Sequence, residues 1–194
     1  NRFKSFFCSS SRAGCYHQVL CSLSVFLLQL VENEEQFQQS LADALVEESS
    51  VIVNVRLAKS LPVPTENETS RPRIDLVVFI INLTSELSFE SAEASLKYLD
   101  CGYFLGKVCF LVTNARSVSV PAERLDAVRK LAALFHCPLL FVEDQTADGV
   151  ASAAERLLTI LKVAAGHVPI TTSLYMSILA QCTVPPDIDQ PSFD

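Results

Sequence analysis

Glycine is scarce in this sequence: the chain has 5 glycines among 194 residues, together with a single methionine and no tryptophan. Loops that bind phosphate use glycines to bring backbone amides close to the ligand, and the P-loop pattern Gly-x-x-x-x-Gly-Lys-Ser/Thr does not occur. A partial match, Gly102-x-x-x-Gly106-Lys107, is one residue short and leads into a predicted strand. We interpret it as a connector.

The chain also lacks any dense run of basic residues. It has 15 Lys and Arg against 22 Asp and Glu, which gives a formal net charge of -7. Contacts to phosphate backbones need clustered positive charge. This balance argues against direct binding of nucleic acid.

Paired cysteine motifs are missing too. The 7 cysteines are odd in number and contain no Cys-x-x-Cys pair, so neither a metal site nor a disulfide framework is indicated, and reduced thiols are expected. A secreted domain remains the alternative, because an apolar stretch covers residues 19–31 and two Asn-x-Thr sequons are present. That alternative predicts paired cysteines. The stretch is too short to span a bilayer.

The most informative segment is residues 73–83, Arg-Ile-Asp-Leu-Val-Val-Phe-Ile-Ile-Asn-Leu. A short, uninterrupted apolar run rich in β-branched residues is typical of a central strand of a parallel sheet with helices on both faces. A buried helix is the alternative, but the run is short and ends in polar residues.

Strand and helix patterns alternate on both sides of this segment. Asn33 and Gln36 have the spacing of a capping box, and Pro121 marks a helix start. Strands are predicted at residues 25–31, 50–58, 107–112 and 138–142, and helices at 33–47, 88–99, 121–135, 150–165 and 172–181. This order predicts an α/β fold with a mostly parallel, doubly wound sheet.

Ligands of such folds bind at the carboxyl ends of the strands, and there the sequence offers little chemistry. After the first strand come Glu32, Glu34 and Glu35, whose charges favour the positive end of the next helix and repel a triphosphate. No Gly-x-Ser-x-Gly elbow is present. We expect no catalytic residue, cofactor or metal, and therefore no enzyme.

The length fits one domain. We expect a flexible amino-terminal segment at residues 1–22, the domain at 23–182 including the added helix 172–181, and a disordered tail at 183–194.

Two strand patterns resemble small Ras-like GTPases. Residues 74–85 are similar to their fourth strand, and residues 107–114 are similar to the strand that ends in the guanine-reading Asn-Lys-x-Asp motif. Here Asn114 is followed by Ala-Arg-Ser, so the lysine and the base-reading aspartate are missing.

A closer resemblance is to the centromere protein M family. It lies in Leu-Ala-Lys-Ser-Leu-Pro at 57–62, Arg-Pro-Arg-Ile-Asp-Leu at 71–76, Phe-Leu-Gly-Lys-Val-Cys-Phe-Leu at 104–111 and Ala-Gly-His-Val-Pro at 165–169. The resemblance implies a pseudo-GTPase that binds no nucleotide. It also implies a nuclear subunit of the inner kinetochore, within the constitutive centromere-associated network, that stabilises a complex with centromere proteins I, H and K during mitosis. The alternative is a divergent small GTPase or nucleotide-binding switch.

Two apolar patches are candidates for contact with a protein partner. Tyr103, Phe104 and Leu105 place large apolar groups in a connector, and Leu174 and Ile178 lie on the added helix. Their alternative role is to cover the protein's own core.

Overall fold

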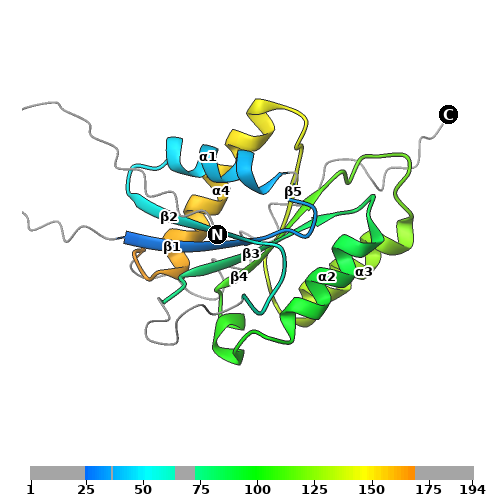
Figure 1. The fold of residues 1–194 in the computed structure, drawn as a ribbon, viewed down its shortest axis with the longest axis horizontal. Coiled ribbons are helices and arrows are strands. Elements are labelled where there is room, and N and C mark those ends of the chain that lie inside the picture. The colour runs from blue at the N-terminus through cyan, green and yellow to red at the C-terminus, as the bar shows by residue number, and fades with distance from the viewer. Residues whose placement is uncertain (1–24, 36, 64–72, 169–194) are drawn as a thin grey trace, which may run out of the picture.

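The computed structural model describes residues 25–35, 37–63 and 73–168 (Figure 1). The predicted helix 172–181, with Leu174 and Ile178, lies outside the described residues, as do the segments 1–22 and 183–194.

A five-stranded sheet forms the centre of the fold, and every strand pair in it is parallel. The strand order is β2-β1-β3-β4-β5, so β3 lies in the middle, as predicted, and β2 lies at an edge. The strands are β1 (Val25–Val31), β2 (Ile52–Ala58), β3 (Leu76–Asn82), β4 (Val108–Thr113) and β5 (Leu139–Val142).

Helices cover both faces of the sheet (Figure 1). The helices α1 (Gln38–Glu47) and α4 (Ala147–Ala164) pack on one face. The helices α2 (Glu86–Leu96) and α3 (Ala122–Leu134) pack on the other. A short 3-10 helix, η1 (Cys101–Phe104), connects α2 to β4. The predicted α/β class with helices on both faces is confirmed.

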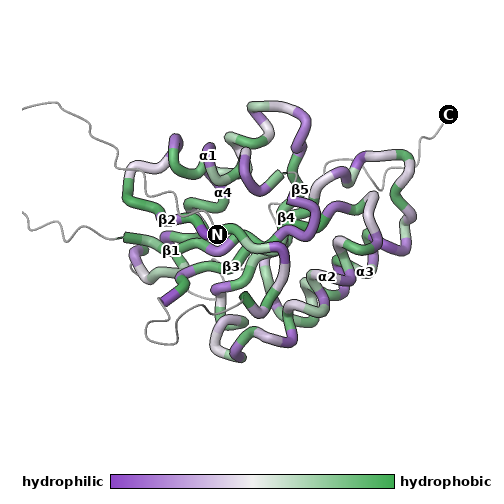
Figure 2. The backbone as a smooth tube through the Cα atoms, in the orientation of Figure 1, coloured by the Kyte–Doolittle hydropathy of each residue, from purple (hydrophilic) through white to green (hydrophobic). Residues whose placement is uncertain are grey.

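The central strand β3 supplies both halves of the core. Leu76, Val78 and Ile80 point into the cluster under α1 and α4, whereas its other apolar residues point into the cluster under α2 and α3. Figure 2 shows this hydrophobic centre with polar residues concentrated in the surrounding loops and helices. Burial on both faces explains why β3 has no polar alternation.

The start of α1 differs from the sequence prediction. The helix begins at Gln38, with Phe37 at the N-cap position and no side-chain cap from that residue, so Asn33 is not its cap. The capping-box prediction was wrong because Glu32, at the end of β1, accepts from the first amides instead. Pro121 lies one residue before α3 rather than inside it.

Two other helices begin earlier than predicted because their caps were missed. Ser85 accepts from the amide of Ser88 at the start of α2, and Thr146 accepts from the amide of Gly149 at the start of α4. A Cβ atom at Gly149 would overlap the carbonyl oxygen of Glu143, so the first turn of α4 requires a glycine at this position. None of the helices in the described ranges is both long and apolar enough to cross a bilayer.

Adjacent residues of β3 test the burial of both faces. Ile80 belongs to one core cluster and Ile81 to the other, and both are buried. We expect Ile80→Ala and Ile81→Ala each to lower the free energy of unfolding by about 2–5 kcal/mol, because each leaves a cavity. Chemical denaturation measures this, with exposed Val118→Ala as control, expected within about 0.5 kcal/mol. A near-neutral result for either isoleucine would contradict a two-faced strand.

Candidate functional site

Because all five strands are parallel, their carboxyl ends meet at one edge of the sheet. That edge is where doubly wound folds bind their ligands. The loops after β1, β3, β4 and β5 therefore define the candidate site.

Glu32, the first residue after β1, is the central group of this edge. Its side chain is 4% exposed. One carboxylate oxygen accepts from the backbone amides of Phe37 at 3.0 Å and Gln38 at 2.7 Å, and the other accepts from Phe37 at 3.2 Å. These amides form the start of α1, the position at which other proteins bind phosphate. The carboxylate of the protein itself therefore occupies the anion position.

The surroundings of Glu32 shift the pKa of its carboxyl group in both directions, and the net shift is upward. Burial raises the pKa of this carboxyl above its ordinary value, and the charges of Glu34 and Asp144 raise it further. The hydrogen bonds from the amides of Gln38 and Phe37 act in the opposite direction and lower it, without cancelling the effect of burial. The edge thus has an excess of negative charge around a group that already fills the amide site.

A chain of side-chain hydrogen bonds crosses the same edge from strand to strand. Asn82 donates to Glu34 at 3.1 Å, and Asn114 donates to Asn82 at 3.1 Å and to Asp144 at 3.4 Å. These four residues come from the loops or ends of β1, β3, β4 and β5, which are consecutive neighbours in the sheet. Asn114 has a φ of 59°, a left-handed conformation that asparagine tolerates. The network links every strand end that would surround a nucleotide.

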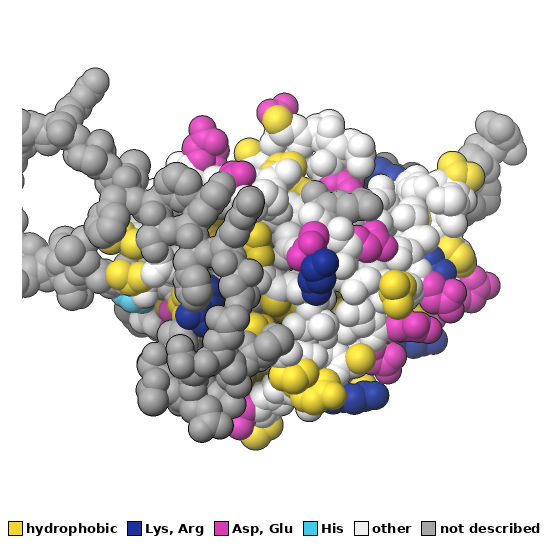
Figure 3. Space-filling view, viewed as in Figure 1, with side chains coloured by type: hydrophobic (Ala, Val, Ile, Leu, Met, Phe, Trp, Pro, Cys, Tyr) yellow, Lys and Arg dark blue, Asp and Glu magenta, His cyan; other side chains and the backbone are white. Residues whose placement is uncertain are grey.

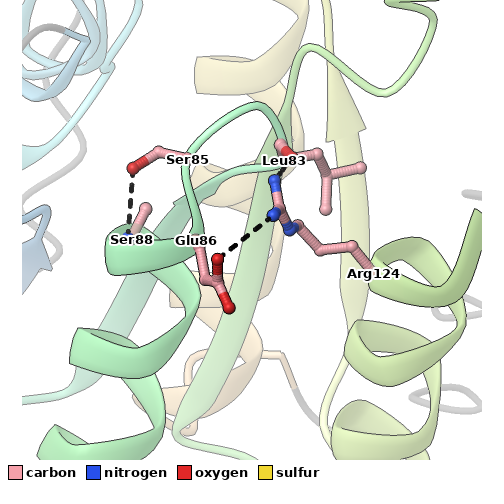
Figure 4. Close-up of polar contacts among 5 residues, drawn as sticks. All are labelled: Leu83, Ser85, Glu86, Ser88 and Arg124. Carbon is pink, nitrogen blue, oxygen red and sulfur yellow. Dashed lines mark hydrogen bonds and ion pairs between the residues drawn. The ribbon is translucent and has the colours of Figure 1, made fainter. Parts of the chain in front are cut away.

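Arg124 of α3 adds a tie beside this network (Figure 4). Its guanidinium donates to the carbonyl oxygen of Leu83 at 2.7 Å and lies 3.9 Å from the Glu86 carboxylate. The arginine therefore fastens α3 to the turn between β3 and α2. Sequence reasoning missed this residue, because its partner is a backbone carbonyl 41 residues away.

The segment after β2 is fastened on two sides. Lys59 pairs with Glu35 across 3.1 Å, and the amide of Leu61 donates to the hydroxyl of buried Ser95 in α2 at 3.0 Å. Of the three glutamates predicted at the helix start, only Glu32 accepts from the helix amides. Glu34 bonds Asn82 and Glu35 bonds Lys59.

The edge has few groups suited to catalysis. The described histidines lie near the amino ends of strands instead: His136 lies between α3 and β5, and His167 contacts Phe26 of β1 edge-on, with ring centroids 4.6 Å apart. Among residues 25–35, 37–63 and 73–168, no three His, Cys, Asp or Glu side chains group as metal ligands. Lys59 and Arg124 are already engaged by the contacts above.

The structure separates the residues predicted to bind a partner. Tyr103 and Phe104 are half-buried against the core under α2 and α3, and Phe104 stacks on Phe135 with ring centroids 4.6 Å apart. Leu105, in contrast, is 84% exposed. Of the three, only Leu105 has its side chain mostly exposed to solvent.

These features define a class: an α/β protein with a Ras-like arrangement, without a glycine-rich phosphate loop, whose carboxyl edge is filled by its own side chains. The chain belongs to the centromere protein M family, since the family model for Centromere protein M matches residues 18–183.

Three relatives named Centromere protein M support this assignment. The Danio rerio protein is 57% identical over 163 residues, which cover 83% of this chain and 88% of that protein. The Xenopus laevis protein is 42% identical, with 85% and 92% covered, and the Homo sapiens protein is 38% identical, with 88% and 94% covered. The resemblance seen in the sequence is confirmed, and with it a location at the centromere and kinetochore of the nucleus.

Glu32 tests the account of the filled edge. Glu32→Ala removes the acceptor of two amides at the start of α1, so we expect a loss of about 1–3 kcal/mol in the free energy of unfolding for each amide left without a partner. Chemical denaturation measures the loss. Glu47→Ala, at an exposed position of the same helix, is the control and should stay within about 0.5 kcal/mol.

The pH dependence of Glu32→Gln supplies the second measurement. A carboxyl whose pKa is raised on folding stabilises the folded state below its unfolded pKa, near 4.5, and loses that contribution as pH rises through the raised value. The stability of the native chain relative to the glutamine variant should therefore fall as pH rises over this window. A difference that rises with pH, or none at all, would contradict the raised pKa.

Proposed function

We propose that this protein is a non-catalytic structural subunit of the inner kinetochore. In this role it stabilises a complex with centromere proteins I, H and K within the constitutive centromere-associated network, and so supports chromosome segregation. The observation that carries the proposal is the Glu32 carboxylate, which accepts from the amides of Phe37 and Gln38 that a nucleotide phosphate would otherwise use.

Charge strengthens this argument. A phosphate brought to the start of α1 would have to displace Glu32 and approach Glu34 and Asp144. Two like charges about 4 Å apart repel by roughly 1 kcal/mol in water and about 4 kcal/mol near a protein surface. A nucleotide would also lose the amide hydrogen bonds that Glu32 now holds. Both effects oppose binding.

The amino edge of the sheet offers a surface for a partner. Leu105 is 84% exposed and Leu134 is 72% exposed, and each is the neighbour in sequence of one ring of the stacked pair Phe104 and Phe135. Single exposed leucines are common, but two beside an aromatic stack form a larger apolar surface. We call these four residues the Leu105 surface.

A divergent GTPase or nucleotide-binding switch is the second candidate. The parallel α/β sheet and the asparagine at the end of β4 favour it, because both belong to the arrangement of small GTPases. However, Asn114 is bonded to Asn82 and Asp144, within the protein. The scaffold role is the better supported function.

Leu105→Asp tests the scaffold role. Because this side chain is exposed, the variant should keep the melting temperature of the native chain but lose most of its recovery with centromere proteins H, I and K after co-expression. Val118→Asp, a fully exposed apolar residue in the loop after β4, is the matched control and should retain the complex.

Leu174→Asp tests the helix predicted at residues 172–181 in the same assay, and we expect it to lose the complex while the chain stays folded. Full recovery of the complex with Leu105→Asp would contradict the proposed surface, and loss of folding would assign Leu105 to the core.

A further inference from the structure

The solvent side of α2 is divided into two rows of different chemistry. The residues facing the sheet are Ser88, Ala92, Ser95 and Leu96. On the opposite side, Glu86, Glu90 and Glu93 are exposed and follow one another at the spacing of one helix face, and exposed Lys97 ends this row.

Beside the acidic row runs an apolar one. Leu87 is 61% exposed and Tyr98, in the turn that ends the helix, is 64% exposed. Exposed Ala94 and half-buried Ser91 lie between them at helical spacing. From Leu87 to Tyr98 the row extends about 17 Å, at roughly 1.5 Å per residue. Figure 3 shows hydrophobic and acidic side chains interspersed on the surface over α2 and α3.

Only the Glu86 end of these rows is used by an ion pair of the described residues. Arg124 lies 3.9 Å from Glu86, but no ion pair between described residues reaches Glu90 or Glu93. The hydrogen bond of Leu61 to α2 is made through Ser95, which belongs to the buried side. The apolar row, together with Glu90 and Glu93 beside it, forms a surface that a second amphipathic helix would complement.

We propose that this side of α2 binds a helix of a partner protein that carries apolar residues every three or four positions and a row of Lys or Arg along one flank. The apolar residues pack on Leu87, Ala94 and Tyr98, and the basic row faces Glu90 and Glu93. Charge selects this occupant over a second copy of the chain, since the net charge of -7 opposes self-association.

This surface shares no residue with the Leu105 surface. The proposal goes beyond the scaffold role, because it names a second contact and the chemistry of the segment that binds there. The two can therefore fail independently in experiments.

Designed helical peptides test the proposal with the full chain. One 18-residue peptide carries leucines at i, i+4, i+7 and i+11 with a flanking lysine row, and a second replaces every lysine by glutamate. Fluorescence anisotropy measures binding of each. We expect the basic peptide to bind at least about tenfold more tightly than the acidic one, and the preference to weaken as salt is raised.

Variants of the chain then test the apolar row and the acidic row one at a time. Leu87→Ser with Tyr98→Ser should weaken the basic peptide by about tenfold or more, and Glu90→Lys with Glu93→Lys should reverse the preference in favour of the acidic peptide. The matched control is Glu155→Lys, at an exposed position of α4, which should leave both affinities unchanged. Leu105→Asp should also leave them unchanged, so a failed scaffold role and a failed α2 site give different results.

Several outcomes would overturn the proposal. These are no binding of the basic peptide at millimolar concentration, equal binding of both peptides, or binding that survives the loss of Leu87 and Tyr98. Circular dichroism melting of each variant excludes unfolding as the cause of a loss.

Discussion

The start of α1 needs an acceptor for its backbone amides, and the Glu32 carboxylate supplies it from the end of β1. This contact determines whether the carboxyl edge has free amides for an anion. Amides that in a nucleotide-binding protein remain open to phosphate are here satisfied inside the chain. The Glu32 carboxyl is buried and its pKa is raised, and the start of α1 needs no bound ligand to satisfy its amides.

The remaining contacts of the edge also satisfy polar groups within the protein. Asn82 and Asn114 connect the loops of neighbouring strands, Arg124 fastens α3 to the turn after β3, and Lys59 and Leu61 fasten the segment after β2. A nucleotide switch needs segments whose contacts change with the ligand. Here the described residues of the corresponding loops are held by contacts within the protein, which agrees with the proposed scaffold role.

The two surfaces proposed for partner contacts share no residue. The Leu105 surface adjoins the stacked aromatic pair at the amino edge, and the two rows of α2 run along one face. The Leu105 surface lies at the amino edge of the sheet, opposite the carboxyl edge where Glu32 accepts from the helix amides.

The alternation of strands and helices and the central place of β3 could be predicted from the sequence, because burial on both faces leaves an uninterrupted apolar run such as Val77 to Ile81. The excess of carboxylates at the first helix was also visible. Which carboxylate accepts from the helix amides was not, since Asn33 and Gln36 matched a local capping pattern that the tertiary contact of Glu32 replaced.

The contacts that cross the edge could not be predicted from local sequence patterns, because they join residues far apart in the chain. Asn82 and Asn114 are 32 residues apart, and Arg124 bonds a carbonyl that no sequence pattern marks. Leu105 differs from Tyr103 and Phe104 only through the course of the connector after η1, which turns two of the three apolar groups toward the core.

The central claim is that the carboxyl edge is closed to nucleotide by Glu32. Its most direct test is an NMR titration of the native chain with GTP and Mg²⁺ that follows the amide resonances of Phe37 and Gln38. The account predicts no change in either resonance and no rise in melting temperature, whereas a ligand at 100 times its Kd would add about 2.7 kcal/mol of stability. Saturable shifts of both amides together with a higher melting temperature would contradict it.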